Sequence, residues 1–145
     1  MTAMSNYLEN KLIDHLLRAS AFSAPANVYV GLVGKYDATQ LEAGTLTHEF
    51  SGGAYARSSG IKGNASIHDI ENLLQLGGTS GLTDNEQNVE FIAASNEWGH
   101  VSGLFVSDAA SGGNVLLYGA LTAVKFVENG DQFIISAGDF DITFA

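Results

Sequence analysis

The sequence predicts a mainly β protein, an antiparallel β-sandwich that begins with an α-helix. Short segments rich in β-branched and aromatic residues recur at intervals of roughly 8–12 residues, which is typical of sandwiches and barrels. Residues 128–131 (Glu-Asn-Gly-Asp) and 111–114 (Ser-Gly-Gly-Asn) have the composition of hairpin turns, because Asn and Gly tolerate a positive φ. The 145 residues include 17 glycines, and 46% of them are hydrophobic, so the composition is that of a turn-rich globular chain.

The first expected element is a helix over residues 5–19. Leucines recur there every four residues, so they share one face of the helix: Leu8, Leu12 and Leu16. Asn6 is a suitable N-cap, and Glu9 stands three positions later, where it completes a capping box. Pro25 prevents the helix from continuing.

The rest of the chain is expected to be built mainly of strands. In chain order, they cover residues 28–33, 54–57, 89–93, 101–107, 115–121, 124–127, 132–136 and 140–144. A short helix is expected over residues 67–76, where apolar residues have helical spacing. We therefore divide the chain into an N-terminal helical arm, residues 1–24, and a β-sandwich domain, residues 25–145, with a Gly-rich insertion at residues 61–88.

Charge and composition exclude several classes of protein. Six basic residues against sixteen acidic ones give a net charge of −10, which repels nucleic acid. Residues 61–145 contain only two basic residues, Lys62 and Lys125. With no cysteine, the chain has no disulfide and no thiolate metal site. Residues 1–20 lack the apolar core of a signal peptide, and no apolar stretch has the length of a membrane span, so we expect synthesis in a cytoplasm and no membrane partner.

No motif of a known catalytic or metal site is present. There is no G-x-S-x-G sequence, and the four histidines have no metal-ligand spacing, so we expect no catalytic residue, no cofactor and no metal. A glycoside hydrolase is a weaker alternative, which needs two carboxylates about 5–10 Å apart in a cleft. Asp139 and Asp141 are one candidate pair, and Glu90 and Glu97 are another. The alternation of Asp139 and Asp141 with apolar neighbours instead favours the solvent-facing side of a strand.

Two groups of residues are candidates for contacts with other molecules. The leucine face of the helix either covers its own sheet or packs on a neighbouring subunit. The assembly interface expected in the second case comprises Tyr7, Leu8, Leu12 and Leu16. Trp98 is either a core residue or a platform for a sugar ring. The candidate exposed recognition residues are Trp98, His68 and Thr79.

Several sequence blocks resemble a family of small virion proteins of tailed bacteriophages, described as tail-fibre-like or head-decoration proteins. The blocks that carry the resemblance are residues 4–18, 28–32, 51–57, 88–92, 97–99, 103–114, 118–121, 130–131 and 137–139. The resemblance implies a non-enzymatic structural protein of the virion, exposed on the head or tail. Its expected partners are capsid or tail proteins and further copies of itself, with a trimer as a candidate assembly. The alternative is a module that recognises a host surface glycan.

Overall fold

The computed structural model describes residues 3–61, 81–85 and 88–143. Two helices and nine strands lie in these segments: β1 (Ala3–Met4), α1 (Asn6–Leu17), β2 (Asn27–Val33), α2 (Ala38–Glu42), β3 (Ser58–Ile61), β4 (Leu82–Thr83), β5 (Val89–Glu90), β6 (Gly99–Ser107), β7 (Val115–Val127), β8 (Ile134–Ile135) and β9 (Ile142–Thr143). All strand pairs are antiparallel. The predicted class, mainly β with an N-terminal helix, is therefore confirmed. The helix expected over residues 67–76 lies outside the described residues.

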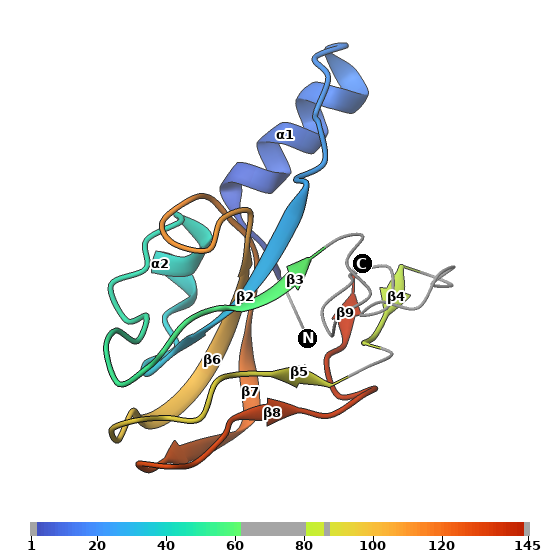
Figure 1. The fold of residues 1–145 in the computed structure, drawn as a ribbon. Coiled ribbons are helices and arrows are strands. Elements are labelled where there is room, and N and C mark those ends of the chain that lie inside the picture. Colours follow the sequence, from blue (N-terminus) through green and yellow to red (C-terminus); the bar gives the residue numbers. More distant parts are fainter. Residues whose placement is uncertain (1–2, 62–80, 86–87, 144–145) are drawn as a thin grey trace.

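The main sheet has five strands in the order β1-β7-β6-β2-β3 (Figure 1). Its centre is the long β6–β7 hairpin, joined by a loop in which Gly112 and Gly113 have positive φ. This loop is the turn predicted at residues 111–114. Two further strand pairs, β5–β8 and β4–β9, form separate ribbons. The turn predicted at residues 128–131 is also present, because the Asp131 N–H donates to the Glu128 carbonyl (3.1 Å).

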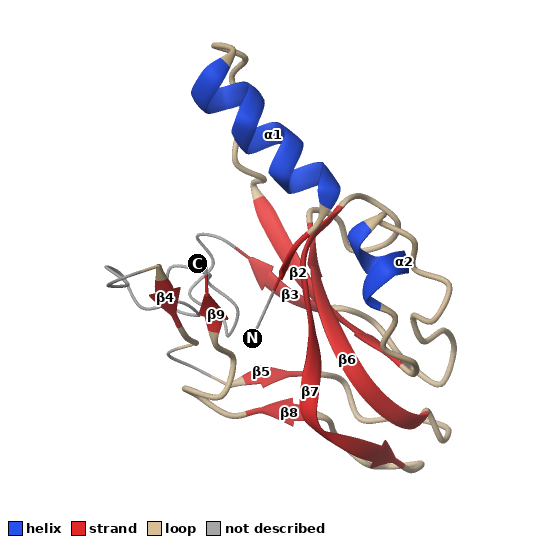
Figure 2. Ribbon diagram, turned by 180° about the vertical axis from the view of Figure 1, so that it is seen from behind, coloured by secondary structure: helices blue, strands red, loops and turns tan. Residues whose placement is uncertain are grey.

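The two faces of the main sheet are covered differently (Figure 2). One face packs against the β5–β8 ribbon in the larger core cluster, which includes Leu32, Leu104, Val106, Val89, Phe91, Phe133 and Ile135. The opposite face is covered by α2 in a smaller cluster of Val33, Leu41, Phe105, Val115 and Tyr118. The second layer of the sandwich is thus a short ribbon, which leaves one end of the long strand β7 without a full covering layer.

The N-cap of α1 lies one residue earlier than predicted. Ser5, and not Asn6, is the cap, because the Ser5 Oγ accepts a hydrogen bond from the Leu8 N–H (3.3 Å). Ser5 is fully buried, and its hydroxyl also donates to the Val115 carbonyl. Its backbone N–H donates to the carbonyl of Leu116 (2.9 Å). This cap therefore joins the base of the helix to the main sheet, and the predicted Asn6–Glu9 capping box is wrong.

Six of the predicted strands also need correction. Residues 54–57 are not a strand: Ala54 has a φ of 61°, and the strand begins at Ser58. Residues 115–121 and 124–127 belong to the single strand β7, in which an irregularity places four residues opposite Ser102 of β6. Within the described residues, the strands expected at 89–93, 132–136 and 140–144 are each two residues long. This irregularity interrupts the alternation of side chains, so the sequence pattern indicates two strands where the structure has one.

β1, β4 and α2 were not predicted from the sequence. Each of the two strands has two described residues, which are too few for a periodic signal. α2 is a five-residue helix capped by Asp37, whose carboxylate accepts from the Gln40 N–H (3.2 Å). Leu41 is its buried residue and packs on the main sheet.

Candidate functional site

The apolar face of α1 is divided between the core and solvent. Leu8 is buried, and Tyr7 and Leu12 are partly buried against the larger core cluster. Leu16 is 75% exposed, although it lies on the same face. The base of the helix is therefore occupied by its own domain, while its outer half is open to another molecule. The assembly interface predicted at these residues stays a prediction, and Leu16 is its exposed member.

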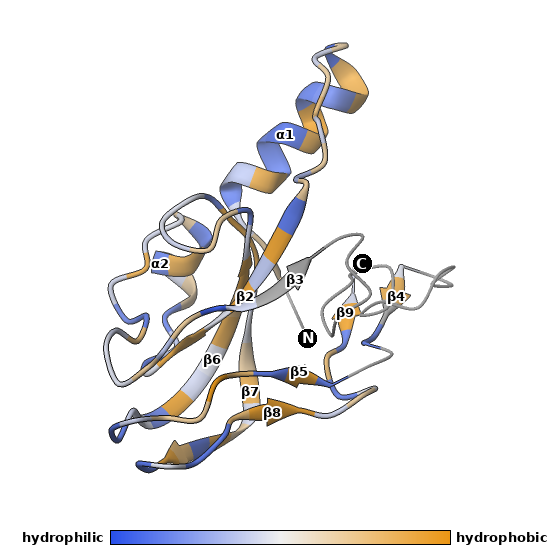
Figure 3. Cartoon of the chain, viewed as in Figure 1, coloured by the Kyte–Doolittle hydropathy of each residue, from blue (hydrophilic) through white to orange (hydrophobic). Residues whose placement is uncertain are grey.

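Two neighbours enlarge the apolar surface at the outer end of α1. Ile13 is 47% exposed and Leu17 is 79% exposed. Together with Leu16 they form what we call the helix tip, which is carried on a helix that extends away from the sheets (Figures 1 and 3). Large apolar side chains gathered on a projecting element are more typical of a protein contact than of a solvated surface.

Local contacts fix the conformation of the helix tip. Asp14 and Arg18 form an ion pair (3.1 Å) one turn apart. The chain then reverses at Ala19, which has a φ of 53°. On the return, the Phe22 N–H donates to His15 Nδ1 (3.2 Å). The end of the helix is thus tied to the segment that follows it, and the tip presents a defined surface.

A buried arginine is the centre of the main polar network. The guanidinium of Arg57 donates to both carboxylate oxygens of Glu49, through Nε (2.7 Å) and Nη2 (2.8 Å). Its Nη1 lies within hydrogen-bond distance of the Ser107 hydroxyl (2.7 Å) and the carbonyls of Ala109 (2.6 Å) and Gly112 (2.8 Å). The Arg57 side chain is 2% exposed. This network fastens the β6–β7 loop to the rest of the sheet.

Trp98 belongs to an aromatic cluster. Its ring lies edge-on to Tyr55 (5.4 Å between centroids) and stacks on Phe50 (6.2 Å). The indole N–H donates to the Gly53 carbonyl (2.8 Å). Trp98 is partly buried against the larger core cluster, so much of its ring packs against residues of its own chain. The recognition role suggested for Trp98 stays a prediction, and His68 and Thr79 lie outside the described residues.

Tyr55 connects the aromatic cluster to the edge of β2. Its hydroxyl oxygen accepts from the Leu32 N–H (2.9 Å), and its O–H lies 3.2 Å from Glu49 Oε1. Burial is the main cause that raises the pKa of Tyr55 above its ordinary value, and the nearby Glu49 carboxylate raises it further. The Tyr55 side chain therefore stays neutral. Its hydroxyl accepts the hydrogen bond of the Leu32 N–H at a position of β2 that does not pair with β3.

Three of the blocks that carry the sequence resemblance meet in these contacts. Residues 51–57 supply Arg57, Tyr55 and the Gly53 carbonyl, residues 97–99 supply Trp98, and residues 103–114 supply the loop that Arg57 holds. The role of Arg57 was not predicted, because its partners are spread over residues 49–112. The arrangement stabilises the fold by joining these three blocks.

The described residues also bear on metal and membrane binding. Among the side chains of residues 3–61, 81–85 and 88–143, no group of three or more His, Asp or Glu could hold a metal ion. In the same segments, neither helix has the length and apolar character that a bilayer span requires.

A buried polar network thus holds the β6–β7 loop against the main sheet, and large apolar side chains are exposed at the outer end of α1. The chain belongs to the family described as podophage GP4 fiber I protein gp80, whose sequence model matches residues 3–143. The predicted resemblance to tailed-phage virion proteins is therefore confirmed. Membership implies a structural protein of the phage virion, in contact with other virion proteins. A search of curated proteins finds no match.

Proposed function

We propose that this chain is a non-enzymatic fibre subunit that is exposed on the virion and assembles through repeated contacts made by the helix tip. The observation that carries the proposal is the exposure of Ile13, Leu16 and Leu17 at 47%, 75% and 79%. Family membership supports a fibre protein. The preferred partner of the tip is the same surface on another copy, as in a closed homo-oligomer, with a trimer as the candidate.

Energetics support an apolar contact at this position. Burying a leucine side chain fully contributes about 1.5–3 kcal/mol. The tip carries three large aliphatic side chains on one short stretch of helix, so mutual burial of several copies offsets part of the cost of association. The ion pair beside the tip, between Asp14 and Arg18, lies on the surface and can stay hydrated at the rim of such a contact.

The test is the mass of the full chain in solution by light scattering. Leu16→Glu places a carboxylate at the centre of the tip, and we expect it to convert an oligomer to a monomer. Asn10→Glu is the matched control, because it makes the same charge change at an exposed position of the same helix. Deletion of residues 1–20 is a poorer test, since it removes the buried Ser5 and Leu8. A wild-type chain that stays monomeric at high concentration would contradict self-assembly through the tip.

Recognition of a host glycan remains the alternative. Trp98 was its candidate platform, and in the structure the indole N–H and ring of Trp98 contact its own chain. A glycan array with the purified protein tests this alternative. Binding that is lost on mutation of Trp98 to Phe would support it.

A further inference from the structure

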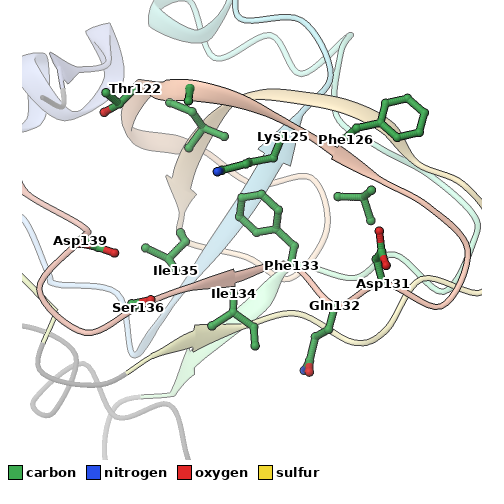
Figure 4. A pocket seen from close by; sticks show the side chains of 13 residues that line it. Thr122, Lys125, Phe126, Asp131, Gln132, Phe133, Ile134, Ile135, Ser136 and Asp139 are labelled. Carbon is green, nitrogen blue, oxygen red and sulfur yellow. The ribbon is translucent and has the colours of Figure 1, made fainter.

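A groove lies between β7 and β8 on the side of the molecule away from α1. These strands are joined by the turn at residues 128–131, but they do not pair with each other: β7 pairs with β6, and β8 pairs with β5. The two strands diverge from the turn and enclose an open groove with a volume of about 560 Å³. The residues that line it lie between positions 121 and 139, on both sides of the turn (Figure 4).

One wall of the groove is a strand edge with little pairing in the described structure. Among the described residues, β1 pairs with this edge of β7 at Leu117 and Tyr118. Beyond that point the strand continues to Val127, and Val124 and Phe126 are 56% and 45% exposed. A long edge with exposed apolar side chains is a template for a further strand, and proteins normally cover or charge such edges.

The floor of the groove is apolar and its two ends are acidic. Phe133 and Ile135 are buried and form part of the floor. Asp131 and Asp139 lie at opposite ends, and Lys125 points into the space between them (Figure 4). Among the described residues, the Asp139 carboxylate accepts no hydrogen bond, and neither it nor Lys125 has an ion-pair partner within 4.0 Å.

We propose that this groove binds an extended peptide segment of another protein, which pairs with the free edge of β7 and carries basic residues toward both acidic ends. Main-chain hydrogen bonds to a strand edge supply affinity, and pockets beside the edge select alternate side chains. Side chains at positions i−2, i and i+2 of a strand point the same way. The central one meets the apolar floor, where the nearby Lys125 ammonium disfavours a second cation, so it is apolar. The outer two meet Asp131 and Asp139, so they are Lys or Arg.

The charge of the chain supports a basic partner. Residues 61–145 carry two basic and eleven acidic residues, a net charge of −9 that attracts a cationic segment and repels another copy of the same region. This inference goes beyond assembly through the helix tip, because it concerns a different surface and a different partner. Either contact can therefore fail without the other.

The experiment measures fluorescence anisotropy of labelled seven-residue peptides with the pattern Thr-Lys-Thr-X-Thr-Lys-Thr, where X is Val, Leu or Phe. Full-length protein is titrated at low salt. Two control peptides carry either Glu in place of both Lys, or methyl groups on alternate backbone nitrogens. The protein variants are Asp131→Asn, Asp139→Asn and the double variant that carries both changes. The matched control is Glu42→Gln on α2, which covers the other face of the sheet.

We expect at least one of the Lys peptides to bind, and its two control peptides to bind at least about tenfold more weakly. Removing both carboxylates in the double variant is expected to weaken binding about fivefold, because each exposed charge pair makes only a modest contribution. Glu42→Gln is expected to have no effect. The proposal is overturned if no peptide binds, if the methylated peptide binds equally well, or if the Asp variants bind as the wild type does. Binding of a saccharide that is lost in Asp139→Asn, with no peptide binding, would assign the groove to a sugar instead.

Discussion

Replacement of Arg57 by methionine tests whether the buried network holds the fold together. Methionine keeps an unbranched side chain of similar length, so it retains part of the packing over the Phe105 ring, which lies 4.9 Å from the guanidinium carbon. It removes every hydrogen bond to Glu49, Ser107 and the loop carbonyls of Ala109 and Gly112. The variant therefore leaves a largely buried carboxylate without its cationic partner.

The expected loss is about 3 kcal/mol of the free energy of unfolding. Removing one partner of a buried ion pair costs about 3–5 kcal/mol. The lower end applies here because the Glu49 side chain is 18% exposed and retains its contact with the Tyr55 hydroxyl. With a urea m-value of about 2 kcal/mol/M, the unfolding midpoint falls by about 1.5 M. Urea unfolding followed by circular dichroism measures this shift.

Two comparisons separate the network from a general effect of losing an arginine. Arg18→Met removes the surface pair with Asp14, whose side chains are 73% and 36% exposed, and should change stability by less than about 1 kcal/mol. The double variant Glu49→Gln/Arg57→Met removes the orphaned charge and should recover part of the loss. A loss below about 1 kcal/mol in Arg57→Met, equal to that of Arg18→Met, would refute the reasoning.

Three further predictions concern the sheet and its tyrosines. Gly31→Ala places a methyl group where the Phe105 ring crosses β2, so it should destabilise the fold by about 1–3 kcal/mol in urea unfolding, whereas equal stability would show that the ring moves aside. Tyr55→Phe leaves a backbone N–H of β2 without its acceptor and should cost about 1–3 kcal/mol by the same assay; no loss would show that another group accepts this bond. Burial raises the pKa of Tyr55, Tyr36 and Tyr118, so the unfolded chain loses these protons first, and stability should fall as pH rises above about 10. Thermal unfolding between pH 8 and 11 checks the direction, and Tyr55→Phe should show a weaker dependence; stability that is flat or rises with pH would contradict it.

Local signals were sufficient to predict much of the fold. The leucine spacing in α1 and the paired glycines at Gly112 and Gly113 act within a few residues, and both elements formed as expected. Asn6 is not the cap because Ser5 forms hydrogen bonds with β7, more than a hundred residues away in sequence. Ala54 failed as a strand residue because its turn positions Tyr55 and the Gly53 carbonyl for distant contacts.

The candidate sites were less predictable because they depend on tertiary arrangement. The leucine repeat indicates an apolar face on α1, but it does not show which part of that face is buried. In the structure the burial ends between Leu12 and Leu16. Likewise, the turn at residues 128–131 predicts that the two strands it joins pair with each other, whereas β7 pairs with β6 and β8 pairs with β5. The groove forms because β7 and β8 pair with other strands instead of with each other. No local sequence pattern indicates this pairing.

The most direct test of the central claim is to locate the chain on purified virions of the phage that encodes it. Antibodies against the purified protein, visualised by gold labelling in electron microscopy, report both presence and position. Label along a fibre, in wild-type particles but not in particles carrying Leu16→Glu, is the result expected for an exposed fibre subunit assembled through the helix tip. Absence of the chain from wild-type particles, or undiminished labelling with Leu16→Glu, would contradict it.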